Sequence, residues 1–139
     1  MTVGFTGSRS GLSYQQQIAI VYILMLLEKN VIKFRHGDCV GSDEQFHKIL
    51  VQVGWKDQIE IHPCTIKNKR AYCKAPIIHD PKPPLDRNRD IVDNSDLLIV
   101  CPKEKEEQLR SGTWATYRYA KQVSKRIIII TPDGKYQKL

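Results

Sequence analysis

The sequence predicts an α/β protein in which helices cover both faces of a mainly parallel sheet of about five strands. Short runs rich in β-branched residues alternate along the chain with segments of helical periodicity. The last of these runs, 127–130, consists only of isoleucine, as is typical of a strand buried on both faces. Because right-handed crossovers place each connecting helix on a face of the sheet, this alternation favours a three-layer sandwich with strand order 3-2-1-4-5.

The first half of the chain predicts three strands and two helices. A helix follows the first strand, with Ser13 as its N-cap and Gln16 placed for a capping box, and it ends near Lys29. A second helix begins at Ser42, and Gly54 terminates it. The three predicted strands cover residues 3–6, 31–35 and 58–62.

Residues 63–84 predict a long basic loop, because they contain five of the seven prolines together with several lysines. We expect this loop to line the ligand site as a lid. The rest of the chain returns to alternating elements, with Ser111 as the N-cap of the last helix. These elements are a helix over 85–94, a strand over 96–101, a helix over 112–124 and a strand over 127–130.

Length and composition fit one globular domain. The chain has 139 residues, of which 41% are hydrophobic and 27% charged, so we expect a single domain over residues 1–139. The longest apolar run, 18–27, has ten residues, about half of the roughly 20 that a membrane-spanning helix needs. The first residues contain no secretion signal, and the four cysteines include no CxxC pair. We therefore expect a cytoplasmic protein with reduced thiols.

Charge narrows the class of partner. The net charge of +7 predicts an anionic partner, for which a nucleotide, a nucleic acid and an acidic membrane surface all qualify. Metal binding has little support, because the spacing of His62, Cys64, Cys73 and His79 matches no familiar structural zinc site. The sequence gives no reason to expect a metal or another cofactor.

The first predicted helix is apolar all round between Ile18 and Leu27, whereas a helix on one face of a sheet needs only an apolar stripe. The simplest cover for the excess apolar surface is a second copy of the chain, so we expect a homodimer or a higher homo-oligomer. The alternative is that the loop 63–84 buries this helix.

Glycine-rich turns follow three of the predicted strands, at the sheet edge where α/β proteins bind their ligands. Each turn offers free backbone N–H groups to an anion, and Arg9 adds a guanidinium. A tight turn without a ligand is an equally good interpretation of the first turn alone. The expected ligand-binding residues in and beside these turns are Gly7, Ser8, Arg9, His36, Gly37, Gly41, Ser42, Asp43, Cys101, Arg110, Ser111, Gly112 and Thr113.

Aromatic side chains near the turns supply a possible platform for a base. Trp114 follows the last turn at the second helical position, which is usually exposed, so we expect it to contact a ligand or an interface rather than the core. Packing against a neighbouring helix is the alternative.

Five segments of the chain, at residues 7–9, 36–43, 87–91, 96–100 and 111–113, have a characteristic order and spacing. Together they resemble the SLOG superfamily of Rossmann-like nucleotide-binding proteins, and most closely its YspA-like group. The chain resembles more distantly the lysine-decarboxylase-like phosphoribohydrolases and DprA of the same superfamily. The resemblance covers nearly the whole chain. Its matching segments are Gly7-Ser8-Arg9, His36-Gly37 with Gly41-Ser42-Asp43, Arg87-Asn88-Arg89-Asp90-Ile91, Asp96-Leu97-Leu98-Ile99-Val100 and Ser111-Gly112-Thr113.

The resemblance implies a phosphate over Gly112 and Thr113, a base toward the first two turns, and ligand contacts from Arg87 and Asn88. Hydrolytic members of the superfamily pair an arginine with a glutamate three residues after the threonine. Arg87 matches that arginine, but Thr116 stands at the glutamate position and supplies no carboxylate for glycosidic chemistry. If the protein is an enzyme, the candidates are Arg87, Asp43 and Asp90.

These observations predict non-catalytic sensing or sequestration of a nucleotide-derived small molecule, such as an ADP-ribose-type or cyclic-nucleotide signal. By analogy alone, such a protein suits a phage or prophage anti-defence role. The first alternative is an N-glycosidase or phosphoribohydrolase that acts on a nucleoside 5′-monophosphate or an NAD-like substrate. The second is DprA-like nucleic-acid binding through the basic residues of the loops.

Overall fold

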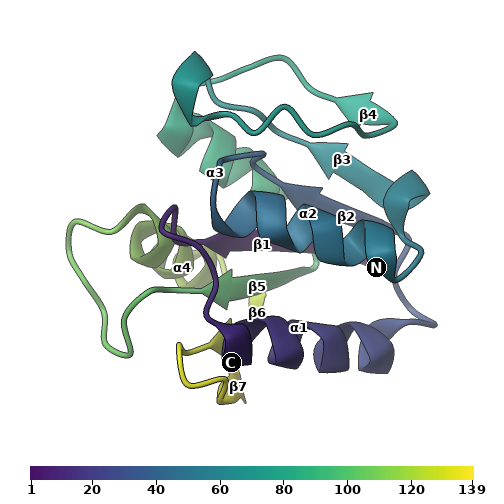
Figure 1. Cartoon of the computed structure of the whole chain (residues 1–139). Helices are drawn as coiled ribbons and strands as arrows, with labels where there is room; N and C mark the ends of the chain where they lie inside the picture. The colour runs from purple at the N-terminus through teal and green to yellow at the C-terminus, as the bar shows by residue number, and fades with distance from the viewer.

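The protein is a seven-stranded sheet between two pairs of helices, described by a computed structural model over all residues from Met1 to Leu139 (Figure 1). The helices are α1 (Tyr14–Leu27), α2 (Ser42–Gln52), α3 (Pro84–Asp93) and α4 (Gly112–Gln122). The strands are β1 (Thr2–Gly7), β2 (Lys33–His36), β3 (Ile59–Ile61), β4 (Ile77–Ile78), β5 (Leu97–Cys101), β6 (Arg126–Ile130) and β7 (Tyr136–Lys138).

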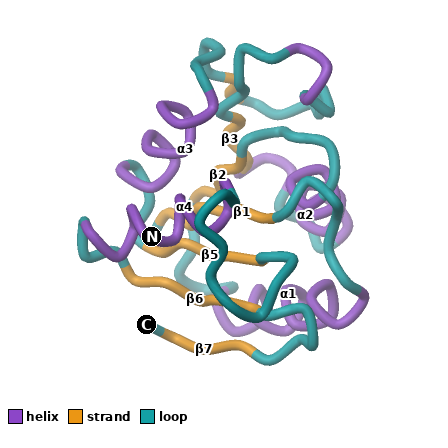
Figure 2. Tube along the Cα trace, turned by 90° about the vertical axis from the view of Figure 1, so that its left-hand side faces the viewer, coloured by secondary structure: helices purple, strands orange, loops and turns teal.

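The sheet has the order β4-β3-β2-β1-β5-β6-β7, and only the β6–β7 pair is antiparallel. Figure 2 shows the three layers, with α1 and α2 on one side of the strands and α3 and α4 on the other. The predicted α/β sandwich is therefore confirmed, and the five predicted strands appear in the predicted order. The two edge strands, β4 and β7, were not predicted from the sequence.

Local signals explain the helix boundaries. The Ser13 side chain accepts a hydrogen bond from the Gln16 N–H, and the Gln16 side chain accepts one from the Ser13 N–H, which completes the predicted capping box. Gln16 also donates to the carbonyls of Pro102 (2.8 Å) and Ile130 (2.9 Å). This side chain thereby ties the start of α1 to the ends of β5 and β6, and it holds the β1–α1 loop beside the β5–α4 loop.

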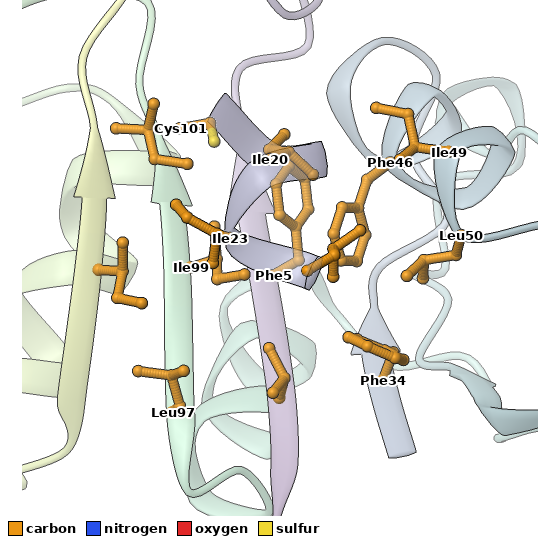
Figure 3. Close-up of a cluster of buried hydrophobic side chains, with 14 of the residues drawn as sticks. Phe5, Ile20, Ile23, Phe34, Phe46, Ile49, Leu50, Leu97, Ile99 and Cys101 are labelled. Atoms are coloured by element: carbon orange, nitrogen blue, oxygen red, sulfur yellow. The ribbon is translucent and has the colours of Figure 1, made fainter. Parts of the chain in front are cut away.

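The main core lies between the sheet and the α1–α2 layer (Figure 3). The rings of Phe5 and Phe46 stack there with centroids 4.1 Å apart, and Phe34 meets Phe46 edge-on. A smaller cluster lies on the other face, under α3 and α4. Residues of β5 alternate between the two clusters, so this central strand is buried on both faces.

The segment 63–84 packs beside the β2–α2 turn and contributes the edge strand β4. Asp38 anchors it, because its carboxylate accepts a hydrogen bond from the Cys73 N–H (3.0 Å) and its carbonyl accepts one from the Ala71 N–H (2.7 Å). Val40 donates in turn to the carbonyl of Lys69. The predicted loop is thus held in place by backbone hydrogen bonds, and it contains one short parallel strand, β4.

Helix α1 keeps an uncovered apolar face. Ile18, Tyr22 and Met25 are 53%, 50% and 68% exposed, respectively. Figure 1 shows the segment 63–84 at the opposite end of the sheet from α1. The alternative in which this loop buries α1 is therefore wrong, because the β3–β4 pairing holds the loop at the far edge. None of the helices has the length and hydropathy needed to cross a bilayer.

Candidate ligand-binding cleft

A cleft of about 470 Å³ opens at the carboxyl ends of the central strands. The β1–α1 loop borders it on one side, and the β5–α4 loop with the first turn of α4 borders it on another. The strand order reverses between β1 and β5, so the cleft occupies the position where open α/β sheets hold their ligands. Its volume falls within the range of small-molecule sites in proteins.

Most of the residues expected from the sequence line this cleft. They come from the three glycine-rich turns and from α3, segments that are far apart in the chain. The expected residues that line the cleft are Gly7, Ser8, Arg9, Gly37, Asp43, Arg87, Asn88, Arg110, Ser111, Gly112 and Thr113.

Gly41 and Ser42 lie behind the first turn and do not line the cleft. Gly41 has φ +97°, and a Cβ at this position would lie 2.1 Å from the carbonyl oxygen of Arg9. The N–H and the hydroxyl of Ser42 both donate to the carbonyl of Ser8. These two residues therefore shape the turn that carries Arg9, and the expectation of direct lining is wrong for them.

His36 is also absent from the cleft surface, because it is completely buried beside α2. Its Nε2 lies 2.9 Å from Nδ1 of His47, and its Nδ1 accepts a hydrogen bond from the Asp38 N–H. Burial, together with the positive charge that His47 would contribute, lowers the pKa of His36 to about 3. His36 is therefore a neutral imidazole that holds the β2–α2 turn in place, and the expected contact between His36 and a ligand is wrong.

Cys101 and Trp114 belong to the two cores. Cys101 takes the alternate position of β5 that faces the α1–α2 layer, and Trp114 is 3% exposed in the cluster under α3 and α4. The expectation of an exposed Trp114 is wrong, because α4 turns this side of its first turn onto the sheet. Its indole Nε1 donates to Oε1 of Glu104 (3.1 Å) and so orients a carboxylate that lines the cleft.

Arg87 forms part of the floor of the cleft and is 6% exposed. Its Nη1 donates to the carbonyls of Gly37 (2.6 Å) and His62 (3.2 Å), and its Nε donates to Oδ1 of Asn88 (2.8 Å). The guanidinium thus clamps α3 to the ends of β2 and β3. It brings a buried positive charge to the floor, while most of its donors already have protein partners.

Asp43 is the buried carboxylate of the cleft. Its Oδ2 accepts a hydrogen bond from the Cys39 N–H (3.1 Å). Burial raises its pKa to about 6, although the nearby charge of Arg87 acts in the opposite direction. Of the three residues expected to matter in an enzyme, Asp43 and Arg87 line this cleft, whereas Asp90 lines a separate cavity and pairs there with Lys82 (2.5 Å).

Several other residues line the cleft that the sequence did not predict. Lys103 and Glu104 begin two residues after the end of β5, and this position after a central strand is the signal that could have predicted them. Lys69 comes from the segment 63–84 and supports the expectation that this segment contributes to the cleft. The full set of missed residues is Phe5, Thr6, Ser10, Cys39, Cys64, Lys69, Pro84, Ile91, Lys103 and Glu104.

The cleft is rich in free positive charge. Arg9, Lys69, Lys103 and Arg110 line it, and none of the four forms a salt bridge. Gly112 and Thr113 at the start of α4 also line the cleft, and their N–H groups have no partner within the helix, whereas the Trp114 N–H donates to Oγ of Ser111. The carboxylates are fewer, since Asp43 and Glu104 are the acidic residues of the lining. This arrangement favours an anionic ligand.

Comparison of sequences finds no matching family model and no matching curated protein. Comparison of structures finds DNA processing protein A from Helicobacter pylori, described for its single-stranded DNA binding mode, with a TM-score of 0.65 at 19% identity. That match covers 93% of this chain and 64% of the other, so this chain spans less than two thirds of its length.

A second similar structure is the structural-genomics target TM1055, with a TM-score of 0.64 at 14% identity over 91% of this chain and 71% of the other. At such identities the likeness concerns the fold. Together with the strand order, it establishes a Rossmann-like α/β fold for this chain.

Proposed function

We propose that this protein binds a nucleotide-derived small molecule in the cleft and does not alter it chemically. The observation that carries the proposal is the set of four cations without salt-bridge partners that line the cleft: Arg9, Lys69, Lys103 and Arg110. Their shared lining position gives a phosphate-bearing ligand charge-assisted hydrogen bonds from more than one side.

The lining divides by chemistry in a way that suits a nucleotide. Arg9 with Ser8 on one side, and Arg110 with the first turn of α4 on the other, provide donors for phosphate oxygens. Phe5 and Ile91 add apolar surface for a base, and the Asp43 carboxyl can accept a hydrogen bond from a sugar hydroxyl. An ADP-ribose-type or cyclic-nucleotide signal combines these three features.

Binding without turnover is supported by the position of Thr116. Its hydroxyl donates to the carbonyl of Gly112 (2.9 Å), and the side chain is buried against its own helix. The first turns of α4 therefore present no acid or base to a bound ligand. In the alternative function, N-glycosidic cleavage, Asp43 would be the acidic residue, because it lines the cleft beside Arg87.

The test is calorimetric titration with ADP-ribose, cyclic mononucleotides, cyclic dinucleotides and nucleoside 5′-monophosphates. We expect one of these classes to bind, and we expect Arg9→Ala and Arg110→Ala each to weaken its affinity about tenfold or more, as for the loss of a charged hydrogen bond. Arg126→Ala is the matched control, because Arg126 is the exposed first residue of β6, at the end of this strand opposite the cleft, and forms no salt bridge.

Two outcomes would contradict the proposal. Folded protein that binds no member of the panel would exclude the ligand class. Free base or nicotinamide, detected by chromatography after incubation with the bound ligand and lost in Asp43→Asn, would favour the N-glycosidase alternative.

A second candidate function is binding of single-stranded nucleic acid. The similar structure from Helicobacter pylori is described as binding single-stranded DNA, and the net charge of this chain is +7. Arg9, Lys103 and Arg110 are exposed and reach the surface as well as the cleft. The dependence of affinity on salt distinguishes this function from nucleotide binding.

We also propose that the protein forms a homodimer through α1. Tyr14, Ile18, Tyr22, Met25 and Leu26 form one stripe along this helix and are all at least half exposed, and α1 contains no charged residue. At roughly 200 Å² for a large side chain, this stripe and its neighbour Val21 expose about 700 Å², close to the roughly 800 Å² per partner of a standard interface. An uncharged apolar face best complements a second copy of itself.

A further inference from the structure

A cluster of metal-binding side chain types lies at the edge of the sheet, away from the cleft. Glu60 is on β3, His62 follows the same strand two residues later, and His79 directly follows β4. The parallel register pairs Ile61 with Ile78, and the His79 N–H donates to the carbonyl of Ile61 (2.9 Å). Because side chains alternate along strands, all three point to the face that α3 covers.

The three side chains are close enough to share one ion. One ligand atom from each of them lies within 4.8 Å of the other two. Nε2 of His79 is 3.0 Å from Oε2 of Glu60, and the imidazoles of His62 and His79 stack with centroids 4.2 Å apart. Two imidazoles and one carboxylate form a donor set that Zn²⁺ accepts with a fourth position left open.

We propose that Glu60, His62 and His79 form a binding site for a divalent transition metal, with Zn²⁺ as the best match. A second cavity of about 390 Å³ lies over the cluster, and its lining includes His62, His79 and Asp80. This cavity gives an ion a route from solvent and leaves space for water at the fourth position. The proposal does not depend on the function of the ligand cleft.

Arg35 occupies the place that the ion would take. Its Nη1 lies 3.0 Å from Nε2 of His62 and forms a salt bridge with Oε2 of Glu60, while Lys33 pairs with the other oxygen of Glu60. The guanidinium therefore competes with a metal for the same two side chains. Its fit is incomplete, because Nε of Arg35 is buried without a hydrogen-bond partner.

Metal binding is consequently an exchange of one cation for another. When the ion binds His62 and Glu60, the guanidinium of Arg35 moves into the polar cavity. Asp80 lines that cavity and forms none of the salt bridges of the protein, so it can receive the displaced charge. This exchange predicts that removal of Arg35 strengthens metal binding, whereas a purely structural ion-pair cluster predicts no metal binding at all.

The experiment is a titration of the reduced full chain with Co²⁺, followed by competition with Zn²⁺. We expect one Co²⁺ per chain with the visible absorption of a tetrahedral ion, and no thiolate-to-cobalt charge-transfer band in the near ultraviolet. His79→Ala should weaken the affinity at least tenfold, and its fold should persist because the side chain is 43% exposed. Arg35→Met should strengthen the affinity about tenfold or more.

His47→Asn is the control, because His47 is a histidine outside the cluster that pairs with His36. It should bind Co²⁺ as the natural sequence does. Wild-type protein without a tetrahedral Co²⁺ spectrum, or His79→Ala with unchanged affinity, would overturn the site. An unchanged or weaker affinity in folded Arg35→Met would overturn the exchange, and Arg35→Gln repeats this test if the methionine variant does not fold.

Discussion

Asp43 illustrates how burial sets the chemistry of a single residue in the cleft. Its carboxyl accepts a backbone hydrogen bond and lies near Arg87, both of which favour the ionised form, yet burial raises its pKa from the ordinary 3.8 to about 6. The folded protein therefore holds this proton more tightly than the unfolded chain does. The associated stability is fully present below pH 3.8 and is lost as the pH rises through 6.

Substitution of Asp43 by asparagine should remove this pH dependence. We expect Asp43→Asn to raise the free energy of unfolding by about 3 kcal/mol at pH 8, and to have almost no effect at pH 4, where the carboxyl is protonated in the folded state. Urea unfolding at the two pH values measures the difference, with Asp57→Asn on the exposed turn before β3 as the control. An equal effect at both pH values would contradict the raised pKa.

Gly41 is the glycine on which the shape of the first turn depends. It combines φ +97° with a Cβ position 2.1 Å from the carbonyl of Arg9, whereas Gly54 has a positive φ but open space, and Gly112 has neither restriction. We expect Gly41→Ala to cost about 3 kcal/mol or more in unfolding free energy, Gly54→Ala about 1 kcal/mol, and Gly112→Ala close to nothing. Thermal unfolding of the three variants provides the ranking, and a tolerated Gly41→Ala would contradict the close approach.

Among the elements, α1 is unusual because it exposes a stripe of apolar side chains that no other part of the chain covers. The opposite side of this helix, which includes Ile20 and Ile23, packs into the main core (Figure 3). An amphipathic helix would place polar groups on the outer side, but here apolar side chains occupy both sides. The proposed dimer interface would cover this excess apolar surface.

Met25→Glu tests this interface. Light scattering after size exclusion should give twice the chain mass of 16.0 kDa for the natural sequence, and one chain mass for the variant, because the dimer would bury an unpaired carboxylate. Leu85→Glu on α3 is the matched control, since Leu85 is 64% exposed outside the stripe and its substitution should leave the dimer intact. A monomeric natural sequence would refute the dimer.

For the whole molecule, the positive charge distinguishes the two candidate functions through salt. Binding along a strand of nucleic acid neutralises many phosphates, so its affinity should fall about a thousandfold or more between 50 and 200 mM salt. A nucleotide with one or two phosphates should lose about tenfold or less over the same range. Fluorescence anisotropy with a labelled single-stranded oligonucleotide and with a labelled nucleotide compares the two.

The proposed nucleotide function predicts that, at 150 mM salt, excess oligonucleotide does not displace the nucleotide. An oligonucleotide that binds tightly at this salt concentration and displaces the nucleotide from the cleft would contradict the nucleotide function. Arg9→Ala would then weaken the binding of both ligands, whereas Arg126→Ala, outside the cleft, would leave the nucleotide affinity unchanged.

The sequence by itself determined the order of the five inner strands, the helix caps and the turns that border the cleft. Each of these depends on local information, such as the pair Ser13 and Gln16, the glycines after the strands, or the run of isoleucines in β6. In a parallel α/β fold the carboxyl ends of the strands lie at the same edge of the sheet. For this reason Gly7, Gly37 and Gly112 meet at one cleft.

Only the tertiary structure decided which way individual side chains face and what lies across from them. Trp114 and His36 are adjacent to lining residues, but both side chains are buried. Trp114 lies on the side of α4 that packs onto the sheet, and His36, the last residue of β2, is covered by α2 through His47. The meeting of Glu60 with His79 depends on β4, whose two residues lie between prolines and give no strand signal in the sequence. Facing and register arise from contacts between segments distant in the chain, and local patterns do not encode them.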